Sequence, residues 1–452
     1  MRQRLQPAID HYHELMSRDL TEADAQLEQL MSLQRERGVL FGDREMARSL
    51  RPTFLTEDFY TSVQDTVYLV RQAVLKIASQ FFNDERVLKE ELGLKDWEIE
   101  LAAIPTNVIR LSATARMDSF VTENSFKFVE INAESPAGIG YVHRMAGVYR
   151  ELPIFQEFTR RFPVRFISPM EHTMMGLVQI YHEQFGGTEE LPAFAIVDHL
   201  DIPTIHEFRI VKEYLEMHGY ACEICDPREL EIRDGWVFAN GRKIDILYRR
   251  LLLNEYYEMK DDCKAFLEGY KSAKTCYLNS FRTKLVHKKA IFAFLTDPTY
   301  THILSPEQRD AIERHIPWTR ILRDHATTFR GLHVDLLEFV RSNRRHFVIK
   351  PNDEYGGKGV SIGFASSEQE WDVALADGLQ LGHVVQEVVD IHREPFLMKS
   401  ADAWEMVPSV VDLDPYLNGP LMGGCLVRVS STNLANVTAG GGSLPMFILR
   451  YA

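Results

Sequence analysis

The most informative segment of the chain reads Phe347-Val348-Ile349-Lys350-Pro351-Asn352-Asp353-Glu354-Tyr355-Gly356-Gly357-Lys358-Gly359-Val360-Ser361-Ile362. Two runs of β-type residues flank a glycine-rich loop. Because glycine has no Cβ, the backbone N–H groups of such a loop can turn inward and approach phosphate oxygens closely. Lys350 ends the incoming strand, where its ammonium group could contact an α- or β-phosphate. The candidate phosphate contacts in the loop are Gly356, Gly357, Lys358 and Gly359.

The spacing of this loop is not the G-x-x-x-x-G-K-[ST] of Walker nucleotide-binding proteins. We interpret it as a phosphate-binding loop of another type, and the alternative is a flexible turn with a solvated lysine. Downstream, Val384-Val385-Gln386-Glu387-Val388-Val389 predicts a strand that begins apolar and then presents Gln386 and Glu387. Such a strand edge can hydrogen-bond adenine through backbone groups, which favours a nucleotide site over a plain core strand.

An earlier segment predicts a β-hairpin. Residues Asn107–Phe120 and Phe126–Asn132 alternate in character, and the polar run Thr122–Ser125 between them is a turn signal. Residues two apart in a strand share one face of the sheet. If the chain folds back about Asn124, the partners across the hairpin follow from counting outward from the turn.

That count places four polar side chains on one face of the hairpin. Asp118 faces Glu130, and Arg116 faces Asn132. Two carboxylates and an amide oxygen suit a hard cation such as Mg²⁺, and opposed carboxylates repel each other unless a cation lies between them. Arg116 is placed to neutralise charge on a transferred phosphoryl group. The alternative is a charged hairpin face exposed to solvent.

The chain has 452 residues, which is more than one hydrophobic core usually holds, so several lobes are expected. Residues 1–102 space apolar residues three and four apart, as in Ala23–Arg35 and Phe59–Phe82, and predict a helical N-terminal region. We assign residues 103–165, which include the hairpin, to the nucleotide-binding core.

Residues 166–275 alternate predicted strands and helices, which indicates a small parallel sheet. The expected elements are strands at Ala193–Val197, Ala221–Cys225 and Ile244–Tyr248, a helix over about 203–218 and a small hairpin at Trp236–Phe238. Residues 276–452 are expected to form the nucleotide-binding lobes. They read as largely helical and basic up to 345, and as strands and glycine-rich turns after His346.

Composition narrows the class of protein. The formal net charge of −14 argues against nucleic acid as the main partner, because no basic stripe is present to release counterions. No apolar stretch is long enough to cross a bilayer, and the first residues lack the apolar core of a signal peptide. We therefore expect a soluble, cytoplasmic enzyme without a membrane partner, and the sequence leaves its oligomeric state open.

The cysteines also favour a reducing compartment, because five in a chain of this length are not a disulfide framework. Cys222 and Cys225 form one C-x-x-C. A second ligand pair for zinc is not apparent, and no helix begins after the pair to lower a thiol pKa. We expect both cysteines to be structural.

These motifs resemble the ATP-grasp superfamily, and specifically its circularly permuted branch, which includes the synthetase domain of glutathionylspermidine synthetase. The R-x-D and E-x-N pairs of the hairpin are similar to the metal and phosphate residues of that family. In an ordinary ATP-grasp chain the lysine and glycine loop come before the acidic strand. Here Arg116–Asn132 comes before Lys350–Gly359, and circular permutation explains the order. The resemblance covers most of residues 103–452.

The resemblance implies roles for further residues. Lys350 resembles the second ATP lysine of the family, and the first is expected at the head of a helix, with Lys289 as our choice and Lys288 as the alternative. The residues similar to the adenine hinge are Gln386, Glu387 and Val389.

Two more regions resemble parts of such enzymes. Arg428 lies in a segment like the one that closes over the phosphates, which makes it a candidate charge clamp. Asn436 could bind phosphate or substrate there, or be a turn residue before the glycine run. Arg249 and Arg250 resemble substrate-side arginines, although surface ion pairs are an equally good interpretation.

The resemblance therefore implies an α/β protein with a circularly permuted ATP-grasp core, a small parallel-sheet lobe and a helical N-terminal region. It implies ATP and Mg²⁺ as cofactors, and ligation of a small or peptide-like carboxylate to an amine through an acyl phosphate. The loop Glu354–Lys358 differs from that of the synthetase, so the two substrates stay open. The alternatives are a small-molecule phosphotransferase and a non-catalytic nucleotide-binding protein.

Overall fold

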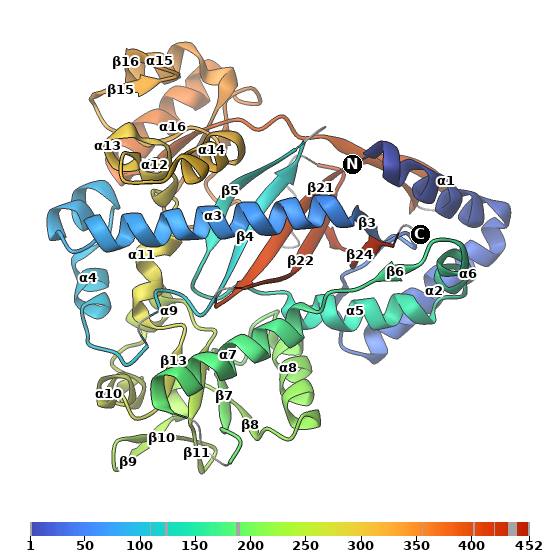
Figure 1. Ribbon diagram of the computed structural model, residues 1–452, viewed down its shortest axis with the longest axis horizontal. Helices are drawn as coiled ribbons and strands as arrows, with labels where there is room; N and C mark the ends of the chain where they lie inside the picture. Colours follow the sequence, from blue (N-terminus) through green and yellow to red (C-terminus); the bar gives the residue numbers. More distant parts are fainter. Residues whose placement is uncertain are drawn as a thin grey trace.

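The central sheet of the molecule has six strands and joins segments that are far apart in the sequence. In this computed structural model the strand order is β23-β22-β21-β4-β5, with β20 paired to β21, and the pairings are antiparallel. The strands are β4 (Thr114–Val121), β5 (Phe126–Asn132), β20 (Arg393–Ser400), β21 (Ala403–Asn418), β22 (Leu421–Ser430) and β23 (Gly442–Ser443). Figure 1 shows the β4–β5 hairpin beside β21 and β22, so the hairpin shares its sheet with residues from the far end of the chain.

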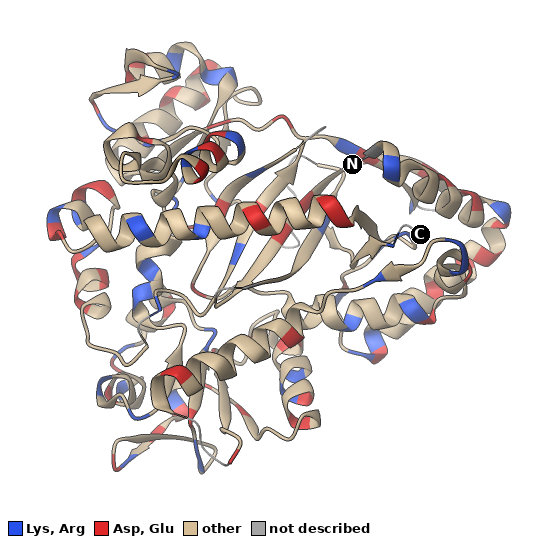
Figure 2. Cartoon of the chain, in the orientation of Figure 1, with Lys and Arg blue, Asp and Glu red and all other residues tan. Residues whose placement is uncertain are grey.

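The structure describes residues 2–108, 110–122, 125–186, 190–354, 356–400, 403–419, 421–432 and 441–450. Within these residues, none of the helices combines the length and the apolar character needed to cross a bilayer. Figure 2 shows acidic and basic residues interspersed along the elements, for example on α3 (Glu57–Phe81).

At its four polar residues the hairpin has the register that was predicted from the sequence. Arg116 pairs with Asn132, and Asp118 pairs with Glu130. The register shifts beyond Asp118, where a β-bulge leads into the turn. Asn124, the expected centre of the turn, lies outside the described residues.

The first strand begins later than its alternation predicted, since β4 starts at Thr114 and not at Asn107. The side-chain oxygen of Asn279 accepts hydrogen bonds from the backbone N–H groups of Ala113 (2.7 Å) and Thr114 (2.9 Å). A side chain from another lobe therefore satisfies these donors, where a neighbouring strand would otherwise do so.

Residues 166–275 contain three strands of the expected parallel sheet, and β13, just beyond them, adds a fourth, in the order β13-β12-β7-β8. Its strands are β7 (Phe194–Val197), β8 (Cys222–Cys225), β12 (Ile246–Arg249) and β13 (Cys276–Leu278), and the helices around it are α7 (Pro169–Phe185), α8 (Ile205–Met217), α9 (Leu253–Glu258) and α10 (Lys264–Ser272). The predicted small hairpin belongs to a three-stranded antiparallel sheet of β9 (Glu231–Arg233), β10 (Trp236–Ala239) and β11 (Arg242–Lys243).

A third lobe carries the glycine-rich loop. Its four-stranded sheet has the order β14-β19-β17-β18, with antiparallel neighbours. The strands are β14 (Thr319–Ile321), β17 (Phe347–Lys350), β18 (Ser361–Ile362) and β19 (Val384–Glu387). The other elements are α11 (Lys284–His287), α12 (Ile291–Thr296), α13 (Pro298–Thr301), α14 (Pro306–His315), β15 (Ala326–Phe329), β16 (Leu332–Asp335), α15 (Leu336–Ser342) and α16 (Glu368–Leu381).

The structure adds to two expectations for residues 276–452. Helices α11 to α15 make up most of the regular structure of residues 276–345, as expected, but strands β13 to β16 also lie there. After His346 the chain includes the helix α16, which the sequence analysis missed although Ser367 and Glu370 form a capping box at its start.

The N-terminal region is mainly helical, as predicted, but it is not separate from the rest. Its helices are α1 (Arg2–Arg18), α2 (Leu20–Glu36), α3 and α4 (Asp96–Ala102), with a π-helical turn at Val87–Glu91, and its strands are β1 (Leu40–Phe41), β2 (Arg44–Glu45) and β3 (Thr53–Thr56). Strand β3 pairs in parallel with β24 (Met446–Leu449), and β24 pairs on its other side with β6 (Val164–Arg165). First and last segments of the described chain thus share one small sheet.

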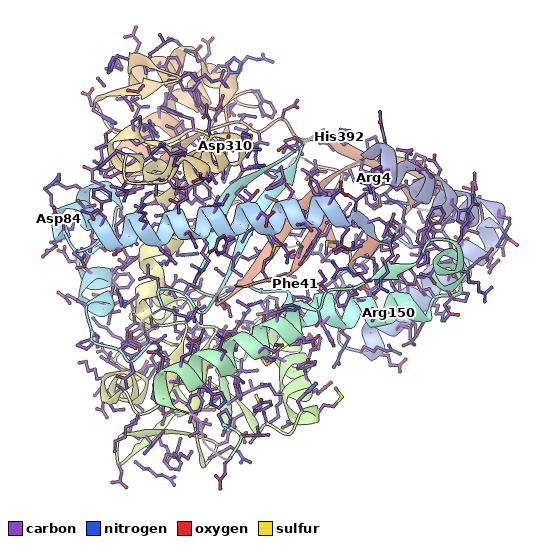
Figure 3. All side chains as sticks on the ribbon, viewed as in Figure 1. Arg4, Phe41, Asp84, Arg150, Asp310 and His392 are labelled. Carbon is purple, nitrogen blue, oxygen red and sulfur yellow. The ribbon has the colours of Figure 1, made fainter. Side chains whose placement is uncertain are left out.

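Helices cover the central sheet. In Figure 1, α3 crosses the sheet, α5 (Ile139–Glu151) and α7 run along its lower edge, and α6 (Pro153–Arg161) lies beside β6. Side chains fill the space between these elements in Figure 3, and one continuous apolar cluster runs from α1 to β24. The loop lobe has a smaller core of its own, around Phe347 and Trp371.

Candidate functional site

A cavity of about 1240 Å³ lies where the hairpin, the glycine-rich loop and the parallel-sheet lobe meet. The hairpin and β22 contribute Arg116, Asp118, Glu130, Asn132 and Arg428 to its wall. The loop lobe contributes Lys289, Lys350, Gly356, Gly357 and Lys358, and β19 with the chain after it contributes Gln386, Glu387 and Val389. Two regions that are some two hundred residues apart in the sequence thus face one hollow, and Phe41, labelled in Figure 3, reaches it from the N-terminal region.

Two arginines, one from β4 and one from β22, hold the Asp118 carboxylate. Arg116 donates to both oxygens, at 2.8 and 3.1 Å, and Arg428 donates to one of them at 2.8 Å. Burial alone would raise the pKa of Asp118, but the two guanidinium groups hold that pKa well below its usual range. Asp118 is therefore a fixed anion.

Arg428 is itself surrounded by acidic groups. Asp412 accepts hydrogen bonds from its backbone N–H and from Nε, both at 2.7 Å, and Asp414 lies 2.9 Å from its Nη2. Burial raises the pKa of Asp412 to about 7, and it raises that of Asp414 well above the usual range. We call Arg116, Asp118, Asp412, Asp414 and Arg428 the arginine cluster. It contains one more carboxylate than it has guanidinium groups.

Two lysines enter the cavity from the loop lobe. Lys289 forms an ion pair with Glu130 at 3.1 Å and donates to the backbone oxygen of Glu354 at 2.5 Å. Lys350 donates to the side-chain oxygen of Gln386 at 2.7 Å. Burial and the nearby Lys289 lower the pKa of Lys350 to about 8, which leaves it mostly protonated at neutral pH.

The glycine-rich loop has the backbone geometry that its sequence suggested. Gly356, Gly357 and Gly359 have φ values of 68°, 76° and 71°, which L-residues with a Cβ rarely adopt. A Cβ at Gly359 would also approach Pro351 Cγ to 2.8 Å. The structure does not place Gly359 on the cavity wall, so its glycine serves the turn.

The strand β19 differs from what was expected of an adenine edge. It lies between β14 and β17, so the backbone of Gln386 is paired on both sides. Its side chain binds Lys350 and donates to Thr319 Oγ1 at 3.0 Å. The Glu387 carboxylate pairs with Arg330 at 2.5 Å. Free backbone groups for a ligand must therefore come from beyond the strand, where Val389 lines the cavity.

Other candidate residues are not brought to the cavity. Lys288 pairs with Glu98 and Asp353, both at 2.8 Å, and does not line the wall, which separates it from Lys289. Arg249 is fully buried: it donates to the backbone oxygen of Asn279 at 2.8 Å and pairs with Glu134 at 3.3 Å. Arg249 therefore does not line the cavity and is not exposed to solvent.

Arg250, the next residue, does line the cavity. Asn436 lies outside the described residues.

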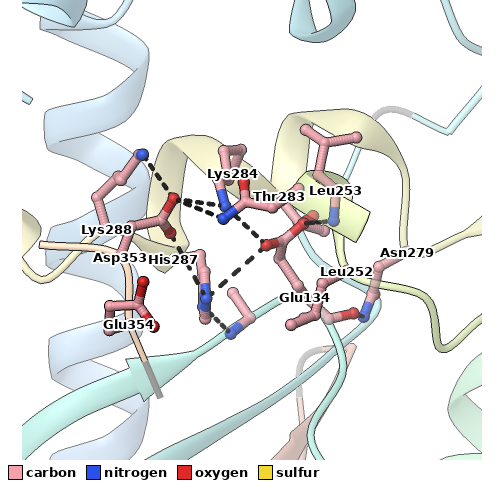
Figure 4. Close-up of polar contacts among 12 residues, drawn as sticks. Glu134, Leu252, Leu253, Asn279, Thr283, Lys284, His287, Lys288, Asp353 and Glu354 are labelled. Atoms are coloured by element: carbon pink, nitrogen blue, oxygen red, sulfur yellow. Dashed lines mark hydrogen bonds and ion pairs between the residues drawn. The ribbon is translucent and has the colours of Figure 1, made fainter. Parts of the chain in front are cut away.

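A second buried group of charges, which Figure 4 shows, was not predicted from the sequence. Lys284 lies 3.0 Å from Glu134, 2.8 Å from Asp353 and 3.6 Å from Glu98. We call Glu98, Glu134, Lys284, Lys288 and Asp353 the lysine cluster. Alternation did offer a signal for Glu134, since it follows Glu130 and Asn132 at the same spacing of two.

Glu134, His287 and Asp353 lie close enough to hold a metal ion, with ligand atoms within 4.8 Å of one another. The ammonium group of Lys284 already provides the positive charge between Glu134 and Asp353. Burial lowers the pKa of His287, so the ring is neutral. Glu134 and Asp353 belong to the lysine cluster, and we do not assign a metal to the trio.

The donor set of the hairpin does fit Mg²⁺. Asp118 and Glu130 are carboxylates that face the cavity, and Asn132 donates to Asp118 through Nδ2 at 2.9 Å, which leaves its amide oxygen as an acceptor. Oxygen ligands of this kind, completed by phosphate oxygens and water, are the ones that Mg²⁺ prefers. Lys289 and Lys350 supply the complementary charge for phosphates.

The two cysteines of the C-x-x-C are free and buried in β8. Burial raises the pKa of both Cys222 and Cys225 to about 12, which opposes redox and metal-binding chemistry. The structural interpretation of this pair agrees with their environment.

No protein-family model matches the chain, and no curated protein matches it at a significant level. Among solved structures, it is similar to a glutathione synthetase-like effector from Globodera pallida in its apo form, with a TM-score of 0.62 and 14% identity over 93% of this chain and 96% of that one. This similarity shows a common fold, and the chain has an ATP-grasp-like fold.

Two further structures overlap less. A putative γ-glutamylcysteine synthetase from Methylobacillus flagellatus has a TM-score of 0.43 and 10% identity, over 83% of this chain and 88% of that one. D-alanyl-alanine synthetase A from Vibrio cholerae has a TM-score of 0.27 and 11% identity, over 48% and 67%. TM-scores this low support no argument.

Proposed function

We propose that this chain is an ATP- and Mg²⁺-dependent ligase that joins a carboxylate to an amine and forms ADP, with a circularly permuted ATP-grasp core like that of glutathionylspermidine synthetase. One observation carries the proposal. The acidic hairpin and the lysine and glycine loop, which lie far apart in the sequence, line the same cavity with complementary charges. In this proposal residues 103–165 and 276–452 form the nucleotide-binding core, and residues 166–275 form a substrate lobe beside it.

The nucleotide would lie between the hairpin and the loop. Lys289 and Lys350 would neutralise its phosphates, and the backbone of Gly356 and Gly357 would approach them closely. Adenine would meet the chain around Glu387 and Val389. Asp118, Glu130 and Asn132 would hold Mg²⁺, which supplies electrostatic stabilisation of the phosphates.

The chemistry proposed for the cavity needs no side-chain nucleophile. An oxygen of the substrate carboxylate attacks the γ-phosphorus, the bond to ADP breaks, and an acyl phosphate forms. The amine then attacks the acyl carbon, inorganic phosphate leaves, and the amine proton passes to solvent. Arg116 and Arg428 stabilise charge as it develops on the transferred phosphoryl group, and their fixed positions limit reorganisation.

The first test is a screen for phosphate release over pairs of acids and amines, with ATP and Mg²⁺ present. Asp118→Asn and Glu130→Gln are expected to abolish turnover, by at least about 100-fold, while circular dichroism shows a folded protein. Asp372→Asn removes a surface carboxylate and is the matched control. Full activity in either hairpin variant would remove the hairpin from the site.

Hydroxylamine trapping distinguishes the ligase from the two alternatives. An acyl phosphate gives a hydroxamate, whereas a phosphotransferase that makes a stable phosphate ester gives none. ATP binding without phosphate release under any acid and amine would favour a non-catalytic nucleotide-binding protein.

A further inference from the structure

Asp198 and Arg250 lie side by side at the carboxyl edge of the parallel sheet. Val197, the last residue of β7, pairs with Arg249, the last residue of β12, and the backbone N–H of Arg250 donates to Val197 O at 2.9 Å. The next residue of each strand, Asp198 and Arg250, lines the cavity. Neighbouring strands are about 4.8 Å apart, so the two side chains start close together. The carboxyl edge of such a sheet is where ligands of α/β proteins usually bind.

Both side chains are buried, yet neither is fully satisfied by the protein. Asp198 is 7% exposed and accepts a hydrogen bond from its neighbour His199 N, at 2.8 Å. Within the described parts of the chain it forms no ion pair at 4.0 Å or less, and Arg250 affects it only at longer range. A buried carboxylate without a cationic partner is costly. Burial accordingly raises the pKa of Asp198 to about 7.

Arg250 is 5% exposed, and both of its Nη atoms contact protein groups. Nη1 donates to Pro136 O at 2.7 Å and to the Tyr248 hydroxyl at 3.2 Å, while Nη2 forms an ion pair with Glu207 at 3.4 Å. Its Nε is buried without a hydrogen-bond partner. A guanidinium group has five N–H donors, so Arg250 keeps donors that the protein does not use.

The subsite borders the proposed phosphate site. Arg250 Nη1 donates to the backbone oxygen of Pro136, and Arg116 Nη1 donates to that of the next residue, Ala137, at 2.9 Å. Consecutive carbonyl groups therefore hold the two arginines. The cavity of about 1240 Å³ is also larger than the roughly 300–1,000 Å³ that one small ligand usually fills.

We propose that Asp198 and Arg250 form a subsite for the α-amino-acid group of a substrate, in which Arg250 binds its carboxylate and Asp198 binds its ammonium group. The inference rests on the proposed function, because it places this group beside the site of phosphoryl transfer. A zwitterion supplies a cation for Asp198 and an acceptor for the donors of Arg250 that the protein does not use. A simple carboxylic acid would leave Asp198 without a cation, and a simple amine would leave those donors of Arg250 without an acceptor. An ammonium group held by an ionised carboxylate is protonated and cannot attack, so this end is for recognition and the reaction takes place elsewhere on the molecule.

The test is equilibrium binding to the full chain without ATP, measured by saturation-transfer NMR and calorimetry. The ligands are the free L-amino acids, each compared with its amide, which lacks the carboxylate, and with its N-acetyl form, which lacks the ammonium group. At least one free amino acid is expected to bind at least about tenfold more tightly than both derivatives, as charge-assisted hydrogen bonds of this kind imply.

The variants identify the two partners. Asp198→Asn is expected to remove the preference over the N-acetyl form and to keep the preference over the amide. Arg250→Lys is expected to weaken the preference over the amide. Glu258→Gln removes another carboxylate from the same wall and is expected to change neither preference.

Three outcomes would overturn the inference. The wild type could bind none of the free amino acids, or it could bind them no more tightly than their derivatives. Asp198→Asn and Glu258→Gln could also change the preference over the N-acetyl form by the same amount. Binding of a fluorescent ATP analogue, measured in parallel, keeps the two proposals separate. If the wild type does not bind the nucleotide analogue, the proposed function is contradicted. If it binds the nucleotide analogue but no amino acid, only the subsite is contradicted.

Discussion

The lysine cluster and the arginine cluster are both buried and charged, but they differ in balance. In the lysine cluster, Glu98, Glu134 and Asp353 are matched by Lys284, Lys288 and the neighbouring Arg249. Burial opposes ionisation there, yet Lys284 and Arg249 lower the pKa of Glu134 to about 2.

The arginine cluster has three carboxylates and two guanidinium groups. Its third carboxyl group has no guanidinium group of its own, and burial together with the neighbouring Asp118 raises the pKa of Asp412 to about 7. A buried ionic cluster with matched charges is therefore suited to a structural role. A cluster with an unmatched carboxyl group is suited to a site that binds a cation or a proton.

The largest effect is expected from breaking the matched cluster. Lys284→Met leaves Glu134 and Asp353 buried without their common cation, and we expect a loss of about 3–5 kcal/mol in the free energy of unfolding. Urea denaturation measures this loss. Lys271→Met, on the exposed end of α10, is the control and should cost less than about 0.5 kcal/mol. Equal stability of the two variants would show that the lysine cluster does not hold the lobes together.

The second prediction uses pH, because the two clusters should respond with opposite sign. The folded-state pKa of Glu134 is lowered, so its stabilisation is present above about 4.5 and is lost as pH falls toward 2. The folded-state pKa of Asp412 is raised, so its contribution is present below about 4 and is lost as pH rises toward 7. Each change should be on the order of 3 kcal/mol over its window.

Urea denaturation of Glu134→Gln and Asp412→Asn against the wild type measures the two slopes. Relative to the wild type, Asp412→Asn should gain stability as pH rises from 4 to 7, and Glu134→Gln should recover stability as pH falls from 4.5 toward 2. Slopes of the same sign would mean that the charge balance of the two clusters is alike.

The smallest effect is expected at two neighbouring lysines with different surroundings. Lys288 belongs to the lysine cluster, whereas Lys289 faces the cavity. Lys289→Met is expected to weaken binding of a fluorescent ATP analogue by about 10- to 100-fold, because it removes a charged hydrogen-bond donor from the phosphates. Lys288→Met is expected to lower the stability and to leave the affinity of the folded protein unchanged. The reverse result would make Lys288 the nucleotide lysine.

The hairpin was predictable because its information is local. Alternation and one turn fix which residues of β4 and β5 face each other, and Asp118 does pair with Glu130. The glycine-rich loop was recognisable for the same reason. Helix α16 carried a local signal too, the capping box of Ser367 and Glu370, but strands on both sides of it concealed the change of period.

What the sequence could not give depends on distant partners. The lysine cluster draws Glu98, Glu134, Lys284 and Asp353 from four separate segments, and no local pattern links them. Gln386 is another example, because only the sheet order shows that β19 is interior and that its backbone is already paired. These features require the tertiary structure.

The pairing of β3 with β24 has a consequence for the synthesis of the protein. Strand β3 at Thr53–Thr56 can find its partner only after the ribosome has made Met446–Leu449. At about 5–20 residues per second, that interval is roughly 20–80 s. During this time the edge of β3 has no native neighbour in the nascent chain, which makes it a natural place for a chaperone to bind and for premature association with other chains to begin.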